Sequence, residues 1–236
     1  MGTCNGASEE EETKQYQIAI LINNAGVAFG GQFEDMESSE IQTLLNVNIV
    51  NMTELFYLFI PRIKKLNEEF AEKQKTSKYA LAGIVNLSSV AAYMPIPSMA
   101  IYAASKTYIH SLSESVYQEQ RNSGSTLRVV TSCPGTTKTE IWTKGGANEK
   151  GVRVPLDTPE HVCQATLKAL DKQDKPIIIP GYFNNLMAFG SVRLTPRSWV
   201  RIISRRAMGQ DPALRDAEEV KEAFAKLGRT KPIKST

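Results

Sequence analysis

The sequence predicts an α/β protein with a parallel sheet covered by helices on both faces, and three observations support this fold class. The apolar run at residues 18–22 is continuous rather than alternating, which is typical of a strand buried on both faces, and residues 82–89 and 126–135 are predicted as the next two strands. Segments with helical spacing of apolar residues separate these predicted strands. Strands that alternate with helices favour right-handed crossovers and hence a parallel sheet.

The elements follow one another with clear boundaries. The first run ends at the sequence NNAG, which marks a turn, and a serine with helical periodicity predicts one long helix over residues 38–66. Pro61 marks the position for a kink in this helix. A second helix is predicted from residue 102 to a stop at Gly124, and a third over about residues 158–170 before a short strand at 175–181.

The remaining segments set the expected domain organisation. Residues 1–17 hold few apolar side chains and an acidic run at 9–12, so we expect a disordered leader. Residues 18–192 form the predicted α/β domain, with a Gly-rich, mobile loop near 140–157 over the site. Residues 193–236 form a basic helical tail.

Composition excludes several classes of function. The 28 basic and 25 acidic residues leave a net charge of +3, too small to indicate a nucleic-acid partner. Three widely spaced cysteines favour reduced thiols and a cytoplasmic location. No apolar run approaches the roughly 20 residues of a membrane span. His110 and His161 lack the spacing of metal ligands, so we predict no metal site.

Tyr102 and Lys106 lie four residues apart in the predicted helix that begins there. Four residues make about one helical turn, so the two side chains share a face. A nearby ammonium favours the phenolate and lowers the pKa of a tyrosine, so this pair predicts a group that exchanges a proton near neutral pH. A surface helix that carries both residues by chance is the alternative.

Polar residues follow each of the three predicted strands, where parallel sheets bind ligands. Together with a lone helix asparagine and the Tyr-x-x-x-Lys motif, they resemble the short-chain dehydrogenase/reductase family over roughly residues 18–141. Ser89 matches better than Ser88 because it lies 13 residues before Tyr102, the family interval. The matching residues are Asn23, Asn24, Ala25, Gly26, Asn48, Ser89, Tyr102, Lys106, Pro134, Gly135 and Thr139.

This resemblance implies a Rossmann-like sheet and hydride transfer between NADP or NAD and a ketone or secondary alcohol. Tyr102 would be the acid/base, Lys106 would lower its pKa and hold the nicotinamide ribose, and Ser89 would bind the oxyanion. Asn48 would hold a water in a proton relay. The family's cofactor positions fall here at Asn23, Ala25, Gly26, Tyr102, Lys106, Pro134, Gly135 and Thr139.

One family segment has no match. Nothing before residue 18 resembles the glycine-rich TGxxxGxG turn that takes the dinucleotide pyrophosphate. By family comparison we expect the first three strands to be missing, in a fragment of a longer enzyme or in a protein that has lost its cofactor site. Binding of NADP or NAD would then be impaired. The alternative is a non-catalytic remnant that acts through dimerisation or partner binding.

The C-terminal third indicates the substrate less directly. Trp142, Tyr182 and Phe183 are candidates for an apolar pocket, although core packing is the more common role of such aromatics. Similarity to hydroxysteroid and 3-oxoacyl reductases suggests a small, lipid-like carbonyl or alcohol substrate, and the family suggests a homodimer.

Arginines every four residues, at 197, 201 and 205, form a basic amphipathic helix. We expect a solvated face packed on the domain rather than a membrane contact.

Overall fold

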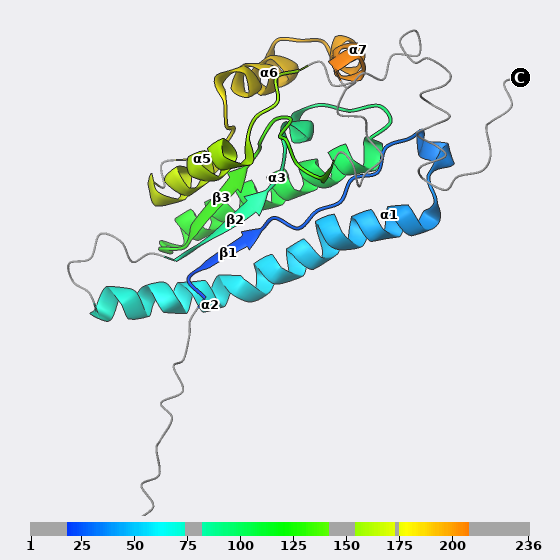
Figure 1. Ribbon diagram of the computed structural model, residues 1–236. Coiled ribbons are helices and arrows are strands. Elements are labelled where there is room, and N and C mark those ends of the chain that lie inside the picture. Colours follow the sequence, from blue (N-terminus) through cyan, green and yellow to red (C-terminus); the bar gives the residue numbers. More distant parts are fainter. Residues whose placement is uncertain (1–17, 74–81, 142–153, 173–174, 208–236) are drawn as a thin grey trace, which may run out of the picture.

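The computed structural model describes residues 18–73, 82–141, 154–172 and 175–207. Within them, one parallel sheet runs in the order β1 (Ile20–Asn23), β2 (Gly83–Leu87), β3 (Arg128–Ser132) and β4 (Ile177–Ile178) (Figure 1). Ile20 pairs with Gly83, and Ile84 pairs with Val129. The predicted α/β class and parallel sheet are confirmed. The predicted leader lies outside the described residues.

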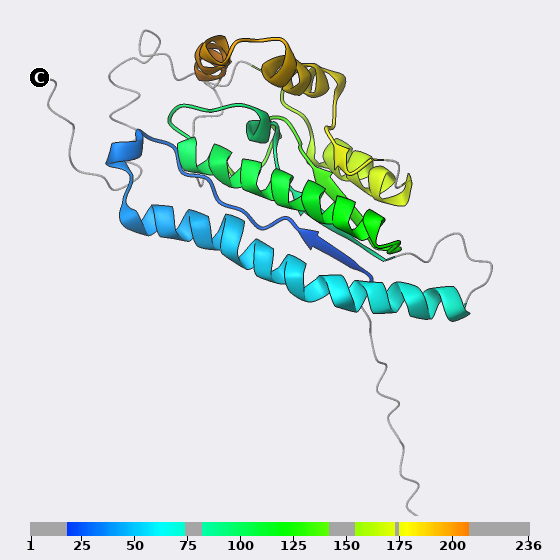
Figure 2. The same cartoon turned by 180° about the vertical axis from the view of Figure 1, so that it is seen from behind.

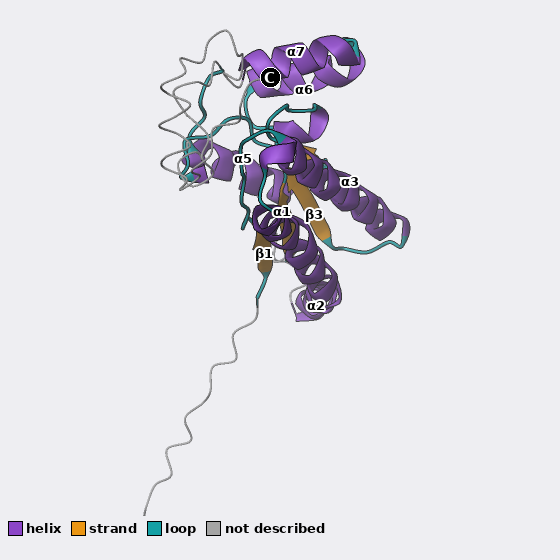
Figure 3. Cartoon of the chain, turned by 90° about the vertical axis from the view of Figure 1, so that its right-hand side faces the viewer, coloured by secondary structure: helices purple, strands orange, loops and turns teal. Residues whose placement is uncertain are grey.

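Helices cover both faces of the sheet because the strand side chains alternate between them. Ile84 and Val129 point to the face packed by α2 (Met52–Lys73) and α3 (Ala100–Asn122). Val85 and Val130 point to the other face and pack against α5 (Pro159–Lys172). Figures 2 and 3 show α2 and α3 together on one side of the strands. The central strands β2 and β3 are therefore buried on both faces, whereas β1, for which the continuous apolar run predicted the same, lies at the edge of the described sheet and leaves Ile20 and Ile22 exposed.

The long N-terminal helix is longer than predicted, and it departs from regular α-helical geometry at a different position from the kink expected at Pro61. It begins with α1 (Ser38–Leu45), where the side chains of Glu37 and Glu40 each accept from the other's backbone N–H, and α2 continues past Pro61 to Lys73. Between them, Asn46–Asn51 form a π-helix. Such insertions in an α-helix frequently mark functional sites. The departure from α geometry thus falls around Asn48.

This helix also qualifies by length and composition as a membrane span. Its Ser38–Glu72 stretch contains an 18-residue window with a mean hydropathy of 1.3. The sequence reading missed it because scattered polar residues interrupt the apolar side chains. One such helix is weak evidence for a membrane span, and only 22% of this window is buried: Leu44, Phe56 and Ile63 are buried against the domain, whereas Tyr57 and Leu58 are exposed.

Asn67 of α2 is a buried amide that holds the starts of two strands together. Its side chain donates to the carbonyls of Ala82 and Thr126, both at 3.2 Å, and accepts from Ala82 N–H at 2.6 Å. Only 1% of the residue is exposed, so water cannot replace these partners. The hydrogen bonds therefore link α2 to the chain just before β2 and β3.

We expect Asn67→Ala to lower the free energy of unfolding by about 3 kcal/mol, since three backbone groups lose their partner in a buried position. Urea denaturation at neutral pH measures this loss. Asn185→Ala, at an exposed asparagine of α6 (Tyr182–Arg193), is the matched control and should change stability by less than about 0.5 kcal/mol. Equal values for the two variants would contradict the structural role of Asn67.

The last two helices lie beyond the carboxyl ends of the strands. In Figure 1, α6 and α7 (Arg197–Ala207) sit side by side above the sheet. Ser191 of α6 donates to the carbonyl of Tyr93 at 3.5 Å, and Ser204 of α7 donates to that of Pro95 at 2.7 Å. Both helices therefore rest on the segment that joins β2 to α3.

Candidate active site

A cavity of about 590 Å³ opens where β1, β2 and β3 end. The turns after these strands form its walls together with the first turns of α3 and α5. Among the described residues that line it, Lys106 is the only charged side chain. Its polar lining includes Asn24, Ser88, Ser89, Tyr102, Lys106 and Thr139. The structure thus brings most of the site residues expected from sequence to one cavity.

Asn48 lies behind the cavity wall and is 1% exposed. Its amide donates to the Val27 carbonyl at 2.9 Å and to Ser105 Oγ at 3.1 Å, while its oxygen accepts from Val27 N–H at 2.9 Å. Both amide protons are therefore occupied. The side chain ties the π-helix to the turn after β1 and to α3. A water held by Asn48 would have to use its remaining acceptor sites.

Lys106 is 5% exposed, and its ammonium donates to the Leu87 carbonyl at 2.9 Å. Burial lowers its pKa from the usual 10.5 to about 8, and the neighbouring Cys133, when ionised, would act in the opposite direction. The same burial raises the pKa of the Cys133 thiol to about 11. A cation with a pKa near 8 can lose its proton at a pH that enzymes commonly experience.

The Tyr102 hydroxyl behaves differently from the sequence prediction. Burial raises the pKa of Tyr102, and a hydrogen bond with Ser89 lowers it by less. The ammonium of Lys106 lies 5.6 Å from the centre of the tyrosine ring, where it favours a cation–π contact. The prediction that Lys106 lowers this pKa is therefore wrong for this structure, because desolvation of the phenolate outweighs the other effects.

The two serines after β2 have separate partners. Ser88 is buried and donates to the Lys106 carbonyl at 2.7 Å, so it fixes α3 to the strand end. Ser89 donates to the Pro134 carbonyl at 3.4 Å, accepts from Ala91 N–H at 3.1 Å, and hydrogen-bonds to Tyr102. The serine chosen by spacing is thus the one that lies beside the tyrosine hydroxyl.

The turn after β1 divides its residues between the cavity and the protein interior. Asn24 and Gly26 line the cavity. A Cβ on Gly26 would lie 3.5 Å from Asn48 Oδ1 and 3.6 Å from Lys106 Nζ, so the turn passes close to both groups. Asn23 instead points inward and donates to Asn86 at 2.8 Å. Neither Asn23 nor Ala25 is part of the cavity lining, although both were expected at the cofactor site.

The other expected cofactor residues, Pro134, Gly135 and Thr139, do line the cavity. Sequence reasoning missed Ser105, the side-chain partner of Asn48, although it directly precedes Lys106. It also missed most of the apolar wall. The aliphatic, methionine and cysteine side chains that form this wall include Ile96, Met99, Ile141, Val162, Cys163 and Leu167. The apolar residues of the MPIPSM segment were the available signal for two of them.

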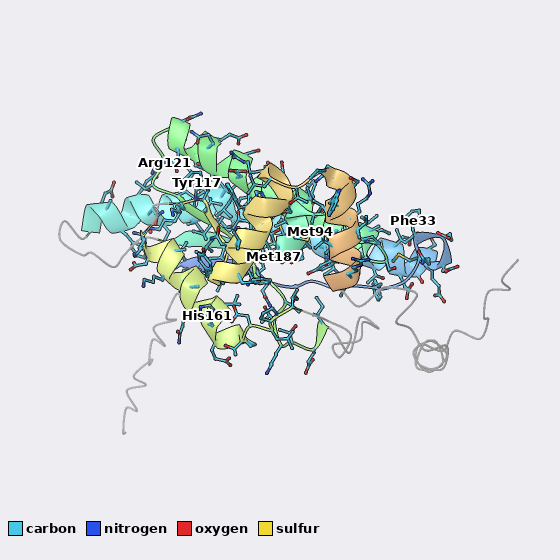
Figure 4. The ribbon with its side chains drawn as sticks, turned by 90° about the horizontal axis from the view of Figure 1, so that it is seen from above. Phe33, Met94, Tyr117, Arg121, His161 and Met187 are labelled. Atoms are coloured by element: carbon cyan, nitrogen blue, oxygen red, sulfur yellow. The ribbon has the colours of Figure 1, made fainter. Side chains whose placement is uncertain are left out.

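Two of the three aromatic residues proposed for the pocket, Tyr182 and Phe183, do not form it. Tyr182 is 86% exposed and Phe183 is 45% exposed, so the core role is wrong for them as well, and neither lines the cavity. Trp142 lies outside the described residues. In Figure 4, Met187 of α6 lies near Met94, on the segment over which this helix packs. The first turn of α6 meets solvent instead.

The histidines hydrogen-bond to protein side chains. His110 bonds to the Tyr93 hydroxyl at 2.8 Å. His161, at the edge of α5 in Figure 4, bonds to Asp157 at 2.8 Å. Within the described ranges, no group of three or more His, Cys, Asp or Glu side chains could hold a metal ion.

Comparison with known proteins connects this geometry to one family. Residues 3–150 match the family model described as short chain dehydrogenase. The chain is 26% identical over 162 residues to the ketoacyl reductase HetN of Nostoc sp., covering 69% of this chain and 51% of that protein. It is 24% identical over 203 residues to the very-long-chain 3-oxoacyl-CoA reductase of Macaca fascicularis, covering 84% and 57%. The chain spans about half the length of such curated relatives.

Solved structures share the fold. A short-chain dehydrogenase from Sphingobium yanoikuyae in complex with NADPH superposes with a TM-score of 0.60 at 22% identity, covering 94% of this chain and 69% of that chain. One from Burkholderia cenocepacia in complex with NADP gives a TM-score of 0.60 at 22% identity, covering 77% and 68%. The matched family model extends over more than half of the sequence. This protein belongs to the short-chain dehydrogenase family.

Proposed function

We propose that the cavity is the site of hydride transfer between NADP(H) or NAD(H) and a ketone or secondary alcohol. The observation that carries this proposal is the convergence of Ser89, Tyr102 and Lys106 on one cavity wall at the strand ends. Several relatives are named reductases, and solved family members contain NADPH or NADP. Of the groups present, Asn24, Tyr102 and Lys106 offer polar atoms to the nicotinamide ribose.

A bound reduced nicotinamide would supply the hydride to the carbonyl carbon. Tyr102 gives its phenolic proton to the carbonyl oxygen, so that the C=O bond becomes CH–OH and the phenolate remains. Ser89 donates a hydrogen bond to the same oxygen as negative charge develops there. Lys106 stabilises the phenolate from behind and, through a bound water near Asn48, allows it to regain a proton.

The raised pKa of Tyr102 keeps its hydroxyl protonated at neutral pH. Because burial disfavours the phenolate, the hydroxyl keeps its proton at neutral pH and is ready to act as an acid. In the reverse reaction the same residue would have to start as a base. We therefore propose that Tyr102 is the proton donor whenever the carbonyl is reduced, while the ratio of reduced to oxidised cofactor sets the net direction.

The cavity also supports a lipid-like substrate. Its wall is mostly apolar side chains, and Lys106 is its one charged group within the described chain. Apolar pockets with a few convergent polar groups bind ligands of matching polarity. The names of the ketoacyl and very-long-chain 3-oxoacyl-CoA reductases agree with this chemistry.

The direct test supplies the purified 236-residue chain with deuterated NADPH or NADH and a series of 3-oxo compounds of increasing chain length. We expect deuterium in the alcohol product and a rate that rises with the length of the apolar tail. Mass spectrometry of the alcohol measures the transfer. Absence of label from every product, with a folded protein, would remove the proposed activity.

We further propose that this chain binds NADP weakly. The described cavity lining offers one cation, Lys106, to a cofactor that carries a negatively charged pyrophosphate. Isothermal titration calorimetry is expected to give a Kd well above the micromolar range. Submicromolar binding to the same chain would overturn this proposal and would leave the catalytic assignment intact.

The outward side of the long helix is the proposed contact of a homodimer. Val50, Tyr57 and Leu58 are exposed there, and Thr53 hydrogen-bonds to Tyr108 of α3 at 3.1 Å, so that α2 and α3 present one surface. Light scattering of the purified chain tests the dimer.

A buried Cys133 with a free thiol agrees with the proposed cytoplasmic location.

A further inference from the structure

The outward surface of α6 and α7 is unusually apolar for a surface that faces solvent. We call it the α6–α7 face and define its apolar part by six side chains that are 49–86% exposed: Tyr182, Leu186, Phe189, Trp199, Ile202 and Ile203. Contiguous exposed apolar patches commonly mark an interaction site, whereas single exposed apolar residues do not. Figures 1 and 3 show the two helices next to one another on the outside of the molecule.

The orientation of both helices is set by their inner sides. On α6, Ala188 and Ser191 are buried against the segment that follows β2, and the Tyr182, Leu186 and Phe189 positions recur on the opposite side at helical spacing. On α7, Val200 and Ser204 are buried, with Ser204 held by the Pro95 carbonyl. The packing of the inner sides therefore fixes the apolar outer sides in an orientation that faces away from the domain.

The charge of these helices is entirely basic. Residues 182–206 contain five arginines, at 193, 197, 201, 205 and 206, and no aspartate or glutamate. The whole chain, in contrast, has 28 basic and 25 acidic residues. Arg193, Arg197 and Arg201 are exposed, and on α7 the 100° step per residue puts Arg197 and Arg201 on the side opposite Trp199. A helix with arginines on its polar side and large apolar side chains on the other suits a boundary between water and hydrocarbon, where the charged heads remain in the polar layer.

The sequence alone favoured a solvated face over a membrane contact, but the exposed apolar side chains argue otherwise, and we propose that the α6–α7 face binds the surface of a phospholipid bilayer that contains anionic lipids. Trp199, in the first turn of α7, is 64% exposed, and tryptophan side chains are enriched at the headgroup level of membranes. The arginines complement anionic headgroups, which are abundant in the cytoplasmic leaflet. A second copy of this chain fits less well, because a symmetric contact would bring the same arginines together.

This face lies on the cavity side of the domain. Pro95, the acceptor for Ser204, directly precedes Ile96, which lines the cavity with Met99. At the start of α6, Asn184 occupies the space that a Cβ on Gly135, another lining residue, would need. The bilayer contact would therefore place the cavity near the membrane surface. The binding itself does not depend on catalysis.

The test uses the purified full chain and vesicles of phosphatidylcholine alone or mixed with phosphatidylserine. We expect the protein to float with the mixed vesicles and to remain free with phosphatidylcholine at physiological salt. In a Trp142→Phe background, Trp199 is the only tryptophan. Its emission should shift to the blue on mixed vesicles and should be quenched by brominated lipid acyl chains, which reports contact at this face specifically.

Matched variants distinguish vesicle binding through the α6–α7 face from nonspecific apolar or electrostatic binding by the rest of the protein. Trp199→Ser should weaken partitioning by roughly tenfold or more, whereas Phe33→Ser, at another exposed aromatic, should not. Replacing Arg193, Arg197 and Arg201 by Gln should weaken it by roughly a hundredfold. The same charge change at exposed Lys168, Lys172 and Lys175 should have less than about a fivefold effect.

Three results would overturn the proposal. The first is that the folded protein does not bind mixed vesicles. The second is that the control variants lose as much vesicle binding as the variants of the α6–α7 face. The third is light scattering that shows a wild-type oligomer converted to a monomer by Trp199→Ser, without vesicle binding by either protein. That last result would identify the α6–α7 face as a contact between copies of the chain.

Discussion

Tyr102→Phe is expected to lower kcat for carbonyl reduction by about 10²- to 10⁴-fold, because phenylalanine keeps the ring but has no proton to give. The ring would still fill its place between the Lys106 ammonium and the cavity. Cofactor affinity should therefore change little compared with kcat. Steady-state rates of nicotinamide oxidation, with KM and kcat determined separately, measure the effect.

Tyr108→Phe is the matched control on the same helix. Its hydroxyl contacts Thr53 and its side chain is 38% exposed, away from the cavity lining. We expect its kcat to stay within about twofold of the wild type, since no reacting group touches it. A Tyr102→Phe protein that reduced the substrate as fast as the Tyr108→Phe protein would exclude Tyr102 as the acid.

Lys106→Met is expected to change how stability depends on pH. In the wild type, Lys106 titrates near 8 when folded and near 10.5 when unfolded. Between these values the unfolded chain binds more protons, so stability of the wild type rises with pH relative to the variant. The difference of 10.5 − 8, or 2.5 pKa units, corresponds to roughly 3 kcal/mol.

The advantage of the methionine variant should thus be largest below pH 8 and should disappear as the pH approaches 10.5. Urea denaturation of both proteins at several pH values measures this difference, and taking the difference cancels most titration elsewhere. Lys168→Met, at an exposed position of α5, is the control and should show no such trend. A constant difference between wild type and Lys106→Met would mean that the buried lysine has an ordinary pKa.

Local sequence features correctly indicated the fold class, and several of the predicted site residues line one cavity. Buried parallel strands need apolar residues on both faces, so β2 could be recognised from its residues alone. Helical spacing likewise placed Tyr102 and Lys106 on one face of α3, and the interval to Tyr102 chose Ser89 over Ser88. The strand and helix inferences depend on repeat distances along the chain, whereas the choice of Ser89 depends on the interval found in the family that the sequence resembles.

Properties that depend on distant neighbours could not be inferred in this way. The π-helix around Asn48 is anchored by Val27, 21 residues away, and by Ser105, 57 residues away. The inward direction of Asn23 follows from Asn86 on the neighbouring strand. No local pattern reports which of several polar groups will meet across the sheet.

The sequence by itself determined the fold class, the family and the order of the residues at the strand ends. Only the tertiary structure decided how far each group is removed from water. Burial raises the pKa of Tyr102 and lowers that of Lys106. Attraction between a phenolate and an ammonium would shift both pKa values in the opposite directions. The tertiary structure likewise leaves the side chains of Tyr182 and Trp199 exposed to solvent. Desolvation is a property of the assembled surroundings, so the spacing of residues along the chain cannot supply it.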